Sequence, residues 1–356
     1  MNNIIQLAPI ALPALSDHPM VSILTSNYNY SAYIGQAIES ILNQDYDQYE
    51  LIICDDGSTD DSARIVKDYC QKDPRIRLIE KNNGGQASAW NMAFQTSTGE
   101  LILFLDADDV FYPDKISSVV KAHQKDSAAG FGIHQVQRVN KQRRPRGVWP
   151  HASLLPGGWC GLQMLTDGGV LSYMPPASGL SLHRSVAAQI FPLPESYPLT
   201  TVADQVITRF APLLTCVLSI HKILAEHRLH GANSYGRSRV TAETISREIT
   251  ICRELWGSQH RFLDNISPDL ASRLQPLERS PYLIYLDYLH ARLSRSPAVA
   301  SYRRYISNVK SNPNARAVWF WKCSIHLPAF LFDSIINFMC GQHIFKEVIA
   351  RFRQAV

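Results

Sequence analysis

Residues 101–109 of the chain read LILFLDADD. Five consecutive apolar residues are typical of a short strand that is buried on both faces of a sheet. Asp106, Asp108 and Asp109 follow at once, and side chains two positions apart in an extended segment point to the same side. Carboxylates on one side repel each other, and an oxygen-binding cation, Mg²⁺ or Mn²⁺, relieves that repulsion. The stretch therefore predicts a cation site; the alternative is that these aspartates cap the next helix and solvate a loop.

Strand-like and helix-like segments alternate on both sides of this stretch. Strands are expected at Met20–Thr25, Glu50–Cys54, Arg75–Glu80 and Leu101–Leu105, and helices at Ser31–Asn43, Asp60–Cys70, Gln86–Thr96 and from Pro113 onward. Ser31 and Pro113 are expected at the start of their helices. The alternation predicts an α/β fold, with a mixed, mainly parallel sheet flanked by helices. Ligands of such sheets bind beyond the carboxyl ends of the strands, where this chain has its polar clusters.

The clusters after the first two strands carry groups that suit a nucleotide. Ser26, Tyr28 and Asn29 follow the first strand, and stacking of the Tyr28 ring on a base is worth about 1–3 kcal/mol. Asp55 and Asp56 follow the second strand, where a carboxylate can accept a hydrogen bond from a base N–H. Each feature also has an ordinary structural interpretation, namely a glycine-containing turn after the two aspartates and simple packing of the tyrosine.

The rest of the chain is less regular and then becomes helical. A strand is expected at Gly130–Val139, a helix at Val202–Leu214 and an extended segment at Cys216–Leu229. Helical patterns follow near residues 241–263, 268–278, 281–295, 298–310 and 317–340. The expected domains are a flexible leader over residues 1–19, an α/β domain over residues 20–240 and a C-terminal helical region over residues 241–356.

Composition excludes several classes of protein. The chain has 356 residues, of which 46% are hydrophobic and 19% are charged, and its net charge is only +4. This charge is too small for a nucleic-acid-binding protein, so we expect no nucleic acid partner. Seven cysteines, an odd number without C-x-x-C spacing, predict free thiols in a reducing cytoplasm. No signal peptide and no uninterrupted transmembrane stretch is recognised.

Three stretches together resemble glycosyltransferase family 2. They are MVSILTSNYNYSAYIGQAIESILNQDYDQYELIICDDGSTDDS from Met20, NNGGQASAWNMA from Asn82 and GELILFLDADDVFYPDKI from Gly99. The resemblance implies the GT-A fold and an inverting transfer of a sugar from a nucleotide-diphosphate sugar, most often a UDP-sugar, to an acceptor hydroxyl. It further implies a divalent cation, Mn²⁺ or Mg²⁺, and a saccharide or lipid-linked acceptor in the synthesis of cell-surface polysaccharide or glycolipid.

The resemblance also assigns roles to individual residues. It implies that Tyr28 stacks near the base, that Asp56 binds the base edge, and that Asp106 and Asp108 form the D-x-D motif. In this motif Asp106 lies towards the ribose and Asp108 binds the metal. The general base matches Asp204, although alanine at position 203 replaces the usual glutamate.

A second motif, HRLHGANS, matches the loop that closes over the diphosphate in related enzymes. It contains Arg228, His230, Asn233 and Ser234, and the resemblance implies that His230 completes the metal shell, with Asp106 and Asp108, or touches phosphate. One departure is Trp90, which stands where the family often has arginine. A donor contact is therefore lost or is supplied elsewhere.

Two other functions remain as alternatives. One is a catalytically silent interaction module of the same fold. The other is a nucleotidyltransferase, which is disfavoured because Ser26–Tyr30 contains neither glycine nor lysine. The aromatic-rich segment Ala317–Cys340 is interrupted by charged residues and proline, so we expect it to lie on a membrane surface or to contact the protein or another subunit, rather than to span a bilayer. The predicted location is cytoplasmic, with peripheral contact to the inner face of the membrane as an option.

Overall fold

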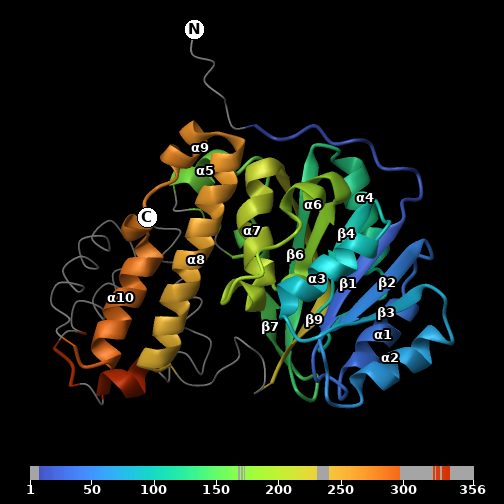
Figure 1. The fold of residues 1–356 in the computed structure, drawn as a ribbon, viewed down its shortest axis with the longest axis horizontal. Coiled ribbons are helices and arrows are strands. Elements are labelled where there is room, and N and C mark those ends of the chain that lie inside the picture. The colour runs from blue at the N-terminus through green and yellow to red at the C-terminus, as the bar shows by residue number, and fades with distance from the viewer. Residues whose placement is uncertain are drawn as a thin grey trace, which may run out of the picture. The chain divides into compact units, whose positions relative to one another are not determined.

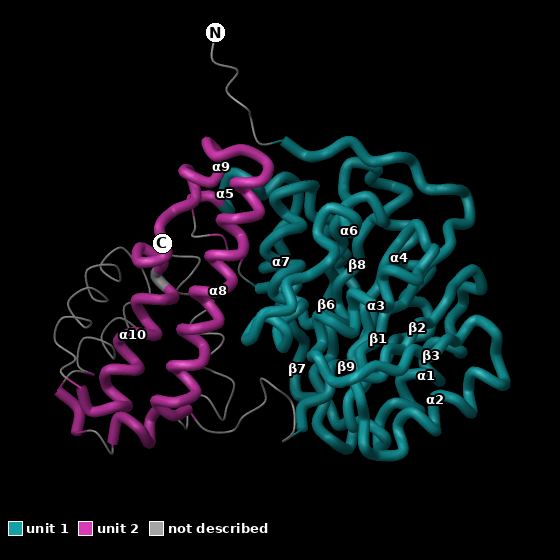
Figure 2. Tube along the Cα trace, viewed as in Figure 1, with its two compact units in different colours: residues 1–164, 173–230 teal, residues 165–172, 231–356 magenta. Residues whose placement is uncertain are grey.

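The structure is a computed structural model, and it describes residues 8–166, 169, 171, 173–230, 240–296, 324, 326–328 and 331–336. The chain divides into two compact units (Figure 2). Unit 1 contains residues 1–164 and 173–230, and unit 2 contains residues 165–172 and 231–356. Each unit is described by itself below.

A mixed sheet forms the centre of unit 1 (Figure 1). Its strands are β1 (Val21–Asn27), β2 (Tyr49–Asp55), β3 (Ile76–Glu80), β4 (Leu101–Phe104), β5 (Val110–Phe111), β6 (Ala129–Asn140), β7 (Pro145–Trp149), β8 (Leu180–His183) and β9 (Cys216–Leu229). Their order is β3-β2-β1-β4-β8-β6-β9-β5, and β7 pairs with β6. Strands β1 to β4 pair in parallel, as do β6 and β9, whereas β8, β5 and β7 pair antiparallel with their neighbours. The predicted α/β fold with a mixed sheet is confirmed.

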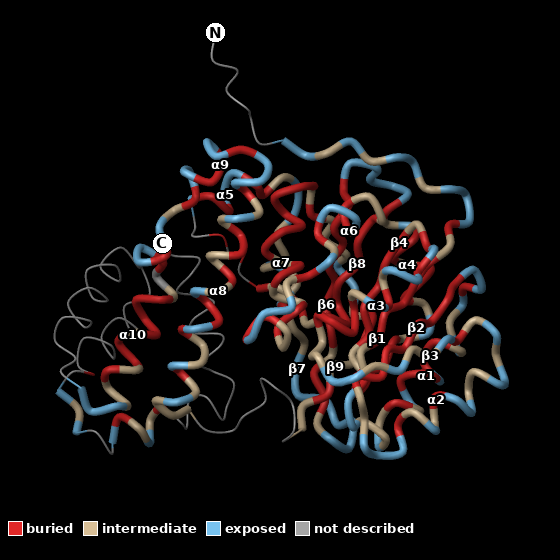
Figure 3. The backbone as a smooth tube through the Cα atoms, in the orientation of Figure 1, coloured by how far each residue is buried: buried red, intermediate tan, exposed pale blue. Residues whose placement is uncertain are grey.

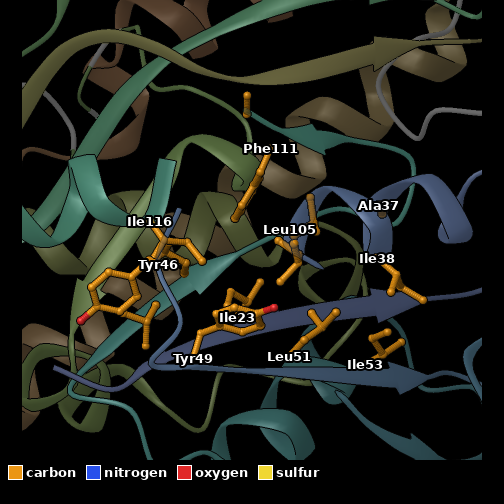
Figure 4. Packing of buried hydrophobic residues seen from close by; sticks show 14 of the residues in the cluster. Ile23, Ala37, Ile38, Tyr46, Tyr49, Leu51, Ile53, Leu105, Phe111 and Ile116 are labelled. Carbon is orange, nitrogen blue, oxygen red and sulfur yellow. The ribbon is translucent and has the colours of Figure 1, made fainter. Parts of the chain in front are cut away.

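Helices cover this sheet and explain its continuous apolar strands. They are α1 (Ile34–Leu42), α2 (Ser62–Cys70), α3 (Gln86–Thr96), α4 (Lys115–Lys125), α6 (Arg184–Ile190) and α7 (Ala203–Leu214), whereas α5 (Gly161–Thr166) begins in unit 1 and ends in unit 2. On one face, Ile23 and Leu51 of the sheet pack with Ile38 of α1 and Ile116 of α4 (Figure 4). Alternate residues of a strand face opposite sides, and Phe104 accordingly packs on Trp90 of α3. Strands β1, β2 and β4 are therefore buried on both faces, and Figure 3 shows this part of the sheet mainly in red.

Two expected helix starts are wrong. Helix α1 begins at Ile34 with Tyr33 as its N-cap residue and without a capping side chain. Ser31 does not cap it, because the Ser31 N–H donates to Asp60 Oδ2 at 2.9 Å and ties the loop before α1 to the loop before α2. Pro113 is not in the first turn of α4, which begins at Lys115. Pro113 instead lies in the loop before α4, where its carbonyl oxygen accepts a hydrogen bond from the Asp45 N–H at 2.9 Å.

The described part of the leader, residues 8–19, has no helix or strand, but it is anchored to unit 1. The Ser16 N–H and Oγ donate to the two carboxylate oxygens of Glu100, at 2.9 and 2.5 Å. The Ile10 N–H donates to Leu214 O at 2.7 Å, at the end of α7. Leu15 packs against the core cluster. These contacts join distant parts of the sequence, and the leader over residues 1–19 stays a prediction.

Unit 2 consists of helices in its described part: α8 (Ala242–Ile266), α9 (Pro268–Arg273) and α10 (Pro281–Leu293). Thr241 and Thr244 form a capping box at the start of α8, and proline occupies the first turn of α9 and of α10, where its missing N–H costs nothing. The helices expected at 298–310 and most of 317–340 lie outside the described residues. None of the helices in the described ranges has the length and apolar character that a bilayer crossing requires.

Candidate active site

The ends of three neighbouring strands bring the predicted polar clusters together. Strands β2, β1 and β4 lie side by side and run in parallel, with Asn27 opposite Asp55 and Leu24 opposite Phe104. The Leu105 N–H donates to Leu24 O at 3.1 Å, which carries the pairing up to the first aspartate of the D-x-D. The carboxyl ends of parallel strands share one edge, so Ser26–Tyr30, Asp55–Ser58 and Asp106–Asp109 follow the same edge of the sheet.

Asp55 is engaged in the turn that it begins. Its Oδ2 accepts hydrogen bonds from Asn27 Nδ2 at 2.6 Å and from Ser58 Oγ at 2.7 Å, and its Oδ1 accepts from the Ser58 N–H at 2.8 Å. Gly57 follows with φ +79°, and a Cβ there would lie 3.0 Å from Asn83 N. This turn therefore needs both the carboxylate at position 55 and the glycine at position 57.

Asp56 holds the loop before α3. Its Oδ1 accepts from Lys81 Nζ at 2.7 Å and from the Gly84 N–H at 2.9 Å, and its Oδ2 accepts from the Gly85 N–H at 2.7 Å. The side chain is buried, with 3% of the residue exposed. A carboxylate has about four acceptor positions, so these three bonds leave room for one further donor on Oδ2.

The loop after β1 combines an exposed ring with an internally bonded amide. Tyr28 is 46% exposed, so its ring is available for stacking, and Ser26 is half-buried at the end of β1. Asn29 has a φ of 59°, and its Oδ1 accepts from the Thr59 N–H at 2.8 Å. The Asn29 N–H donates to Ser58 Oγ at 2.9 Å. Asn29 thus fixes the two loops to each other and leaves Tyr28 at the surface.

Four aspartates from two parts of the chain gather beyond β4. Burial raises the pKa of Asp106 well above its usual value, and the nearby carboxylates of Asp109, Asp108 and Asp204 raise it further. Asp204 belongs to the first turn of α7, so the structure brings this distant residue to the D-x-D. Burial also raises the pKa of Asp108, while a hydrogen bond from His230 opposes that rise. The folded protein therefore disfavours the ionised forms of Asp106 and Asp108.

The end of β9 supplies the cationic and imidazole groups of the same cluster. The Arg228 N–H donates to Asp109 Oδ1 and its Nε donates to Asp108 O, both at 2.9 Å. His230 Nε2 lies 2.7 Å from Asp108 Oδ2, and the Tyr33 ring stacks on the imidazole with centroids 5.0 Å apart. Asn233 and Ser234 of the same motif lie outside the described residues.

The donor set suits a divalent cation that also has ligands from a substrate. No group of three His, Cys, Asp or Glu side chains in the described ranges is close enough to hold a metal ion alone. Asp106, Asp108 and His230 nevertheless offer two carboxylates and an imidazole, and crowding of carboxylates around Asp106 disfavours its ionised form. Mg²⁺ and Mn²⁺ typically take one or two carboxylates together with substrate phosphates. These residues therefore fit such an ion as partial ligands.

Two buried residues near the cluster were not predicted from the sequence. Lys115 is fully buried; its Nζ donates to Ser178 O at 2.6 Å and lies 3.3 Å from the Phe111 ring centroid. Burial holds the pKa of Lys115 well below its usual value, although Asp109 and Asp106 oppose this. Ser178 Oγ also accepts from the Asp106 N–H at 3.1 Å. A lysine at the start of an amphipathic helix is ordinarily exposed, so no sequence pattern marks it.

Trp90, which departs from the family pattern, is part of the core. It is fully buried, and its ring centroid lies 4.6 Å from that of Phe104. The tryptophan therefore packs in the core between α3 and the sheet. A separate cavity of about 370 Å³ lies between Leu12–Asp17 of the leader and His123 and His183. His183 pairs with Leu101, the first residue of β4, so this cavity is at the opposite edge of the sheet.

The sequence of the chain is similar to a family of known proteins. Residues 22–182 match the model described as "Glycosyl transferase family 2". An uncharacterized glycosyltransferase of Nostoc sp. is 31% identical over 228 residues, which are 60% of this chain and 66% of that protein. Chondroitin synthase of Escherichia coli is 43% identical over 108 residues, 30% of this chain but only 16% of that protein. The chain thus spans two thirds or less of the length of these relatives.

Two solved structures have the same fold. S. aureus TarS 1–349 in complex with UDP-GlcNAc matches with a TM-score of 0.52 and 16% identity, over 92% of each chain. The mannosyltransferase PcManGT from Pyrobaculum calidifontis, in complex with GDP-Man and Mn²⁺, matches with a TM-score of 0.50 and 15% identity, over 97% of this chain and 89% of that one. The GT-A fold expected from the sequence is confirmed by these likenesses.

Proposed function

This chain is a glycosyltransferase of family 2, and we propose that it moves a sugar from a nucleotide-diphosphate sugar to an acceptor hydroxyl with inversion. The observation that carries this proposal is the gathering of Asp106, Asp108, Asp109 and Asp204 with His230 at the carboxyl edge of the sheet. An acidic edge of this kind suits a site where a cation and phosphates meet. UDP-sugars are the first donors to test, and GDP-sugars the second, since TarS and PcManGT hold one of each.

In this proposal the donor nucleotide lies along the ends of β1, β2 and β4. The exposed ring of Tyr28 stacks on the base. Asp56 accepts a base N–H at the acceptor position that Lys81 and the two glycines leave open. Asp106 then lies towards the ribose. Ser26, Asn29 and Asp55 act less directly, because the bonds of Asn29 and Asp55 hold the two loops in place.

Asp108, Asp106 and His230 would hold the divalent cation, as their donor atoms and the charge around them favour. When bound, Mn²⁺ or Mg²⁺ offsets negative charge on the departing nucleotide diphosphate. Arg228 holds the segment after β4 that contains the two carboxylate ligands, through its bonds to Asp108 and Asp109. Unchanged turnover in excess EDTA would contradict the cation.

Asp204 is the proposed general base. It lies in the first turn of α7, where the positive end of the helix dipole favours an ionised carboxylate, and close enough to Asp106 to raise the pKa of that group. An ionised Asp204 accepts the proton of the acceptor hydroxyl as its oxygen attacks the anomeric carbon. Attack from the face opposite to the diphosphate inverts the anomeric configuration.

The acceptor is proposed from the relatives. The likeness to a chondroitin synthase over 108 residues favours a saccharide in polysaccharide synthesis, and a lipid-linked saccharide is the second choice. A cytoplasmic location, and a peripheral membrane or oligomer contact through residues 317–340, stay predictions. The boundary between the α/β domain and the helical region near residue 240 is likewise proposed.

Replacing Asp204 by asparagine separates the chemistry from binding. Because a general base contributes about 10²- to 10⁴-fold, Asp204→Asn is expected to lower turnover by that factor and to leave donor affinity unchanged. Asp269→Asn is the matched control, since Asp269 is an exposed aspartate in the first turn of α9. Turnover is measured as nucleotide release, and affinity by calorimetry with Mn²⁺. Turnover of Asp204→Asn equal to that of the control would remove the assignment.

A further inference from the structure

Gln86 contacts the acidic cluster but has no part in the reaction described so far. It opens α3 directly after Gly84 and Gly85, whose N–H groups donate to Asp56. The Gln86 Nε2 donates to Asp106 Oδ1 at 3.1 Å. In this bond the amide nitrogen of Gln86 is the donor, so the amide oxygen, which can only accept hydrogen bonds, is not used by Asp106. The residues from Gly84 to Gln86 therefore contact both Asp56 and Asp106.

The amide oxygen of Gln86 remains for a ligand. Among the residues that the structure describes, none donates a hydrogen bond to Gln86 Oε1, and this atom is not one of the buried polar atoms that lack a partner. Solvent therefore reaches it. An amide oxygen accepts only from an N–H or O–H group, so it does not suit the phosphates of a nucleotide sugar and does suit its hydroxyls.

The backbone before Gln86 is fixed on two sides. Asp56 holds the N–H groups of Gly84 and Gly85, at 2.9 and 2.7 Å. Gly85 has φ +88°, and a Cβ there would lie 2.7 Å from the Cβ of Thr200. Both the left-handed conformation and the contact with Thr200 exclude a side chain at position 85. The direction in which Gln86 leaves the loop is thus determined by the protein before any donor binds.

One face of α3 changes from apolar to polar at Gln86. Gln86 and Trp90 are four residues apart and so share a face of the helix. Trp90 packs on Phe104 of β4, and Gln86 contacts Asp106 two residues further along the chain. Since Trp90 is buried in the core, Gln86 is the polar side chain that this face offers to the acidic cluster.

We propose that Gln86 binds the donor directly, with Nε2 held by Asp106 and Oε1 accepting a hydrogen bond from a hydroxyl of the nucleotide sugar. The inference rests on the proposed function, because it needs a nucleotide sugar at this edge. The hydroxyl belongs either to the ribose or to the transferred sugar, and the acceptor chemistry is the same for both.

The test compares Gln86→Met with Gln95→Met. Methionine keeps the length of the side chain and removes the amide, and Gln95 is an exposed glutamine in the same helix. Dissociation constants are measured by calorimetry with Mn²⁺ for UDP, for UDP without its ribose hydroxyls (2′,3′-dideoxy-UDP) and for UDP-GlcNAc, with the GDP and GDP-mannose series in parallel. Gln86→Met is expected to weaken binding about tenfold, and the control is expected to bind like the wild type.

The ligands identify the hydroxyl. A loss with UDP that disappears with the dideoxy nucleotide assigns the contact to the ribose, and a loss with UDP-GlcNAc but not with UDP assigns it to the transferred sugar. Equal losses with all three ligands would mean that Gln86 only shapes the loop, and would overturn the direct contact, as would Gln86→Met binding as well as the control. If the wild type binds none of these nucleotides, the proposed function falls, and this inference with it.

Discussion

The loops after β1 and β2 differ from the cluster beyond β4 in how their carboxylates are satisfied. Asp55 accepts three hydrogen bonds from Asn27 and Ser58, and Asp56 accepts three from the loop before α3. In contrast, Asp106 and Asp108 are crowded by other carboxylates, and the pKa of each is raised. Carboxylates whose oxygens accept hydrogen bonds stabilise the fold, whereas buried carboxylates that lie close together favour the binding of a cation. Substitutions in the two regions should therefore change different properties.

Between Asp55 and Asp106, the larger effect on turnover is expected for Asp106→Asn in the crowded cluster. Losing one of the carboxylates that would hold the cation weakens the stabilisation of charge on the departing diphosphate, so turnover should fall by about 10²- to 10³-fold. Its raised pKa means that the folded protein disfavours the ionised form, so stability is lost as the pH rises through the unfolded and then the folded pKa. A neutral asparagine avoids that loss, and the melting temperature at neutral pH should rise. A fall in melting temperature would show that the carboxylate is well accommodated; Asp68→Asn, on the exposed side of α2, is the control.

The opposite pattern is expected for Asp55→Asn. An asparagine at this position cannot accept all three hydrogen bonds on charged oxygens, and its NH₂ group faces donors. The free energy of unfolding should fall by about 1–3 kcal/mol, with turnover of the folded fraction changed less than in Asp106→Asn. Denaturant unfolding and nucleotide release measure the two quantities. A loss of turnover without a fall in the free energy of unfolding would indicate that Asp55 contacts the substrate rather than only stabilising the loop.

A smaller effect is expected on the pH dependence of the unfolding free energy, and it comes from the edge of the sheet opposite to the site. His123 is buried, with Nδ1 3.1 Å from Ala129 O and Nε2 3.0 Å from Ser181 Oγ. Burial lowers its pKa to about 4, His183 adds to that and Asp126 opposes it. Below pH 6.5 the unfolded chain binds the proton first, so stability is complete above that pH and falls as the pH drops towards 4. The loss should reach about 2 kcal/mol between about pH 7 and about pH 5.

His123→Gln should remove this part of the pH dependence and keep the part that comes from His134 and His183, because burial also lowers the pKa of those two histidines. The exposed His221 of β9 is the control position, and His221→Gln should keep the slope of the wild type. Unfolding free energies that fall equally with pH in His123→Gln and in the wild type would assign the slope to other groups.

The sequence predicted most of the strands and helices of unit 1, and the three polar clusters, because these depend on patterns between near neighbours. Apolar runs such as LILFL fit a doubly covered strand, and α3 and β9 have the bounds expected from the sequence. Asp204, Arg228 and His230 came only from the family resemblance, and the structure brings them to the D-x-D aspartates.

Contacts between distant side chains were not predictable in the same way. Ser31 bonds to Asp60 instead of capping a helix, and Lys115 is buried on Ser178. Gln86 reaches Asp106, and Tyr33 stacks on His230. Each pair is separated by 20 or more residues, and periodicity says nothing about which distant side chains meet. The substitution at position 90 was equally ambiguous until its burial placed it in the core.

The anchored leader has a practical consequence for the choice of an expression boundary. Strand patterns alone would place the start of the domain at residue 20. A protein that begins there lacks the bonds of Ser16 to Glu100 and of Ile10 to Leu214. Leu214 ends the helix whose first turn contains Asp204. Such a truncation would therefore release the far end of the helix that orients the proposed base, and a start before residue 8 is preferable for kinetic work.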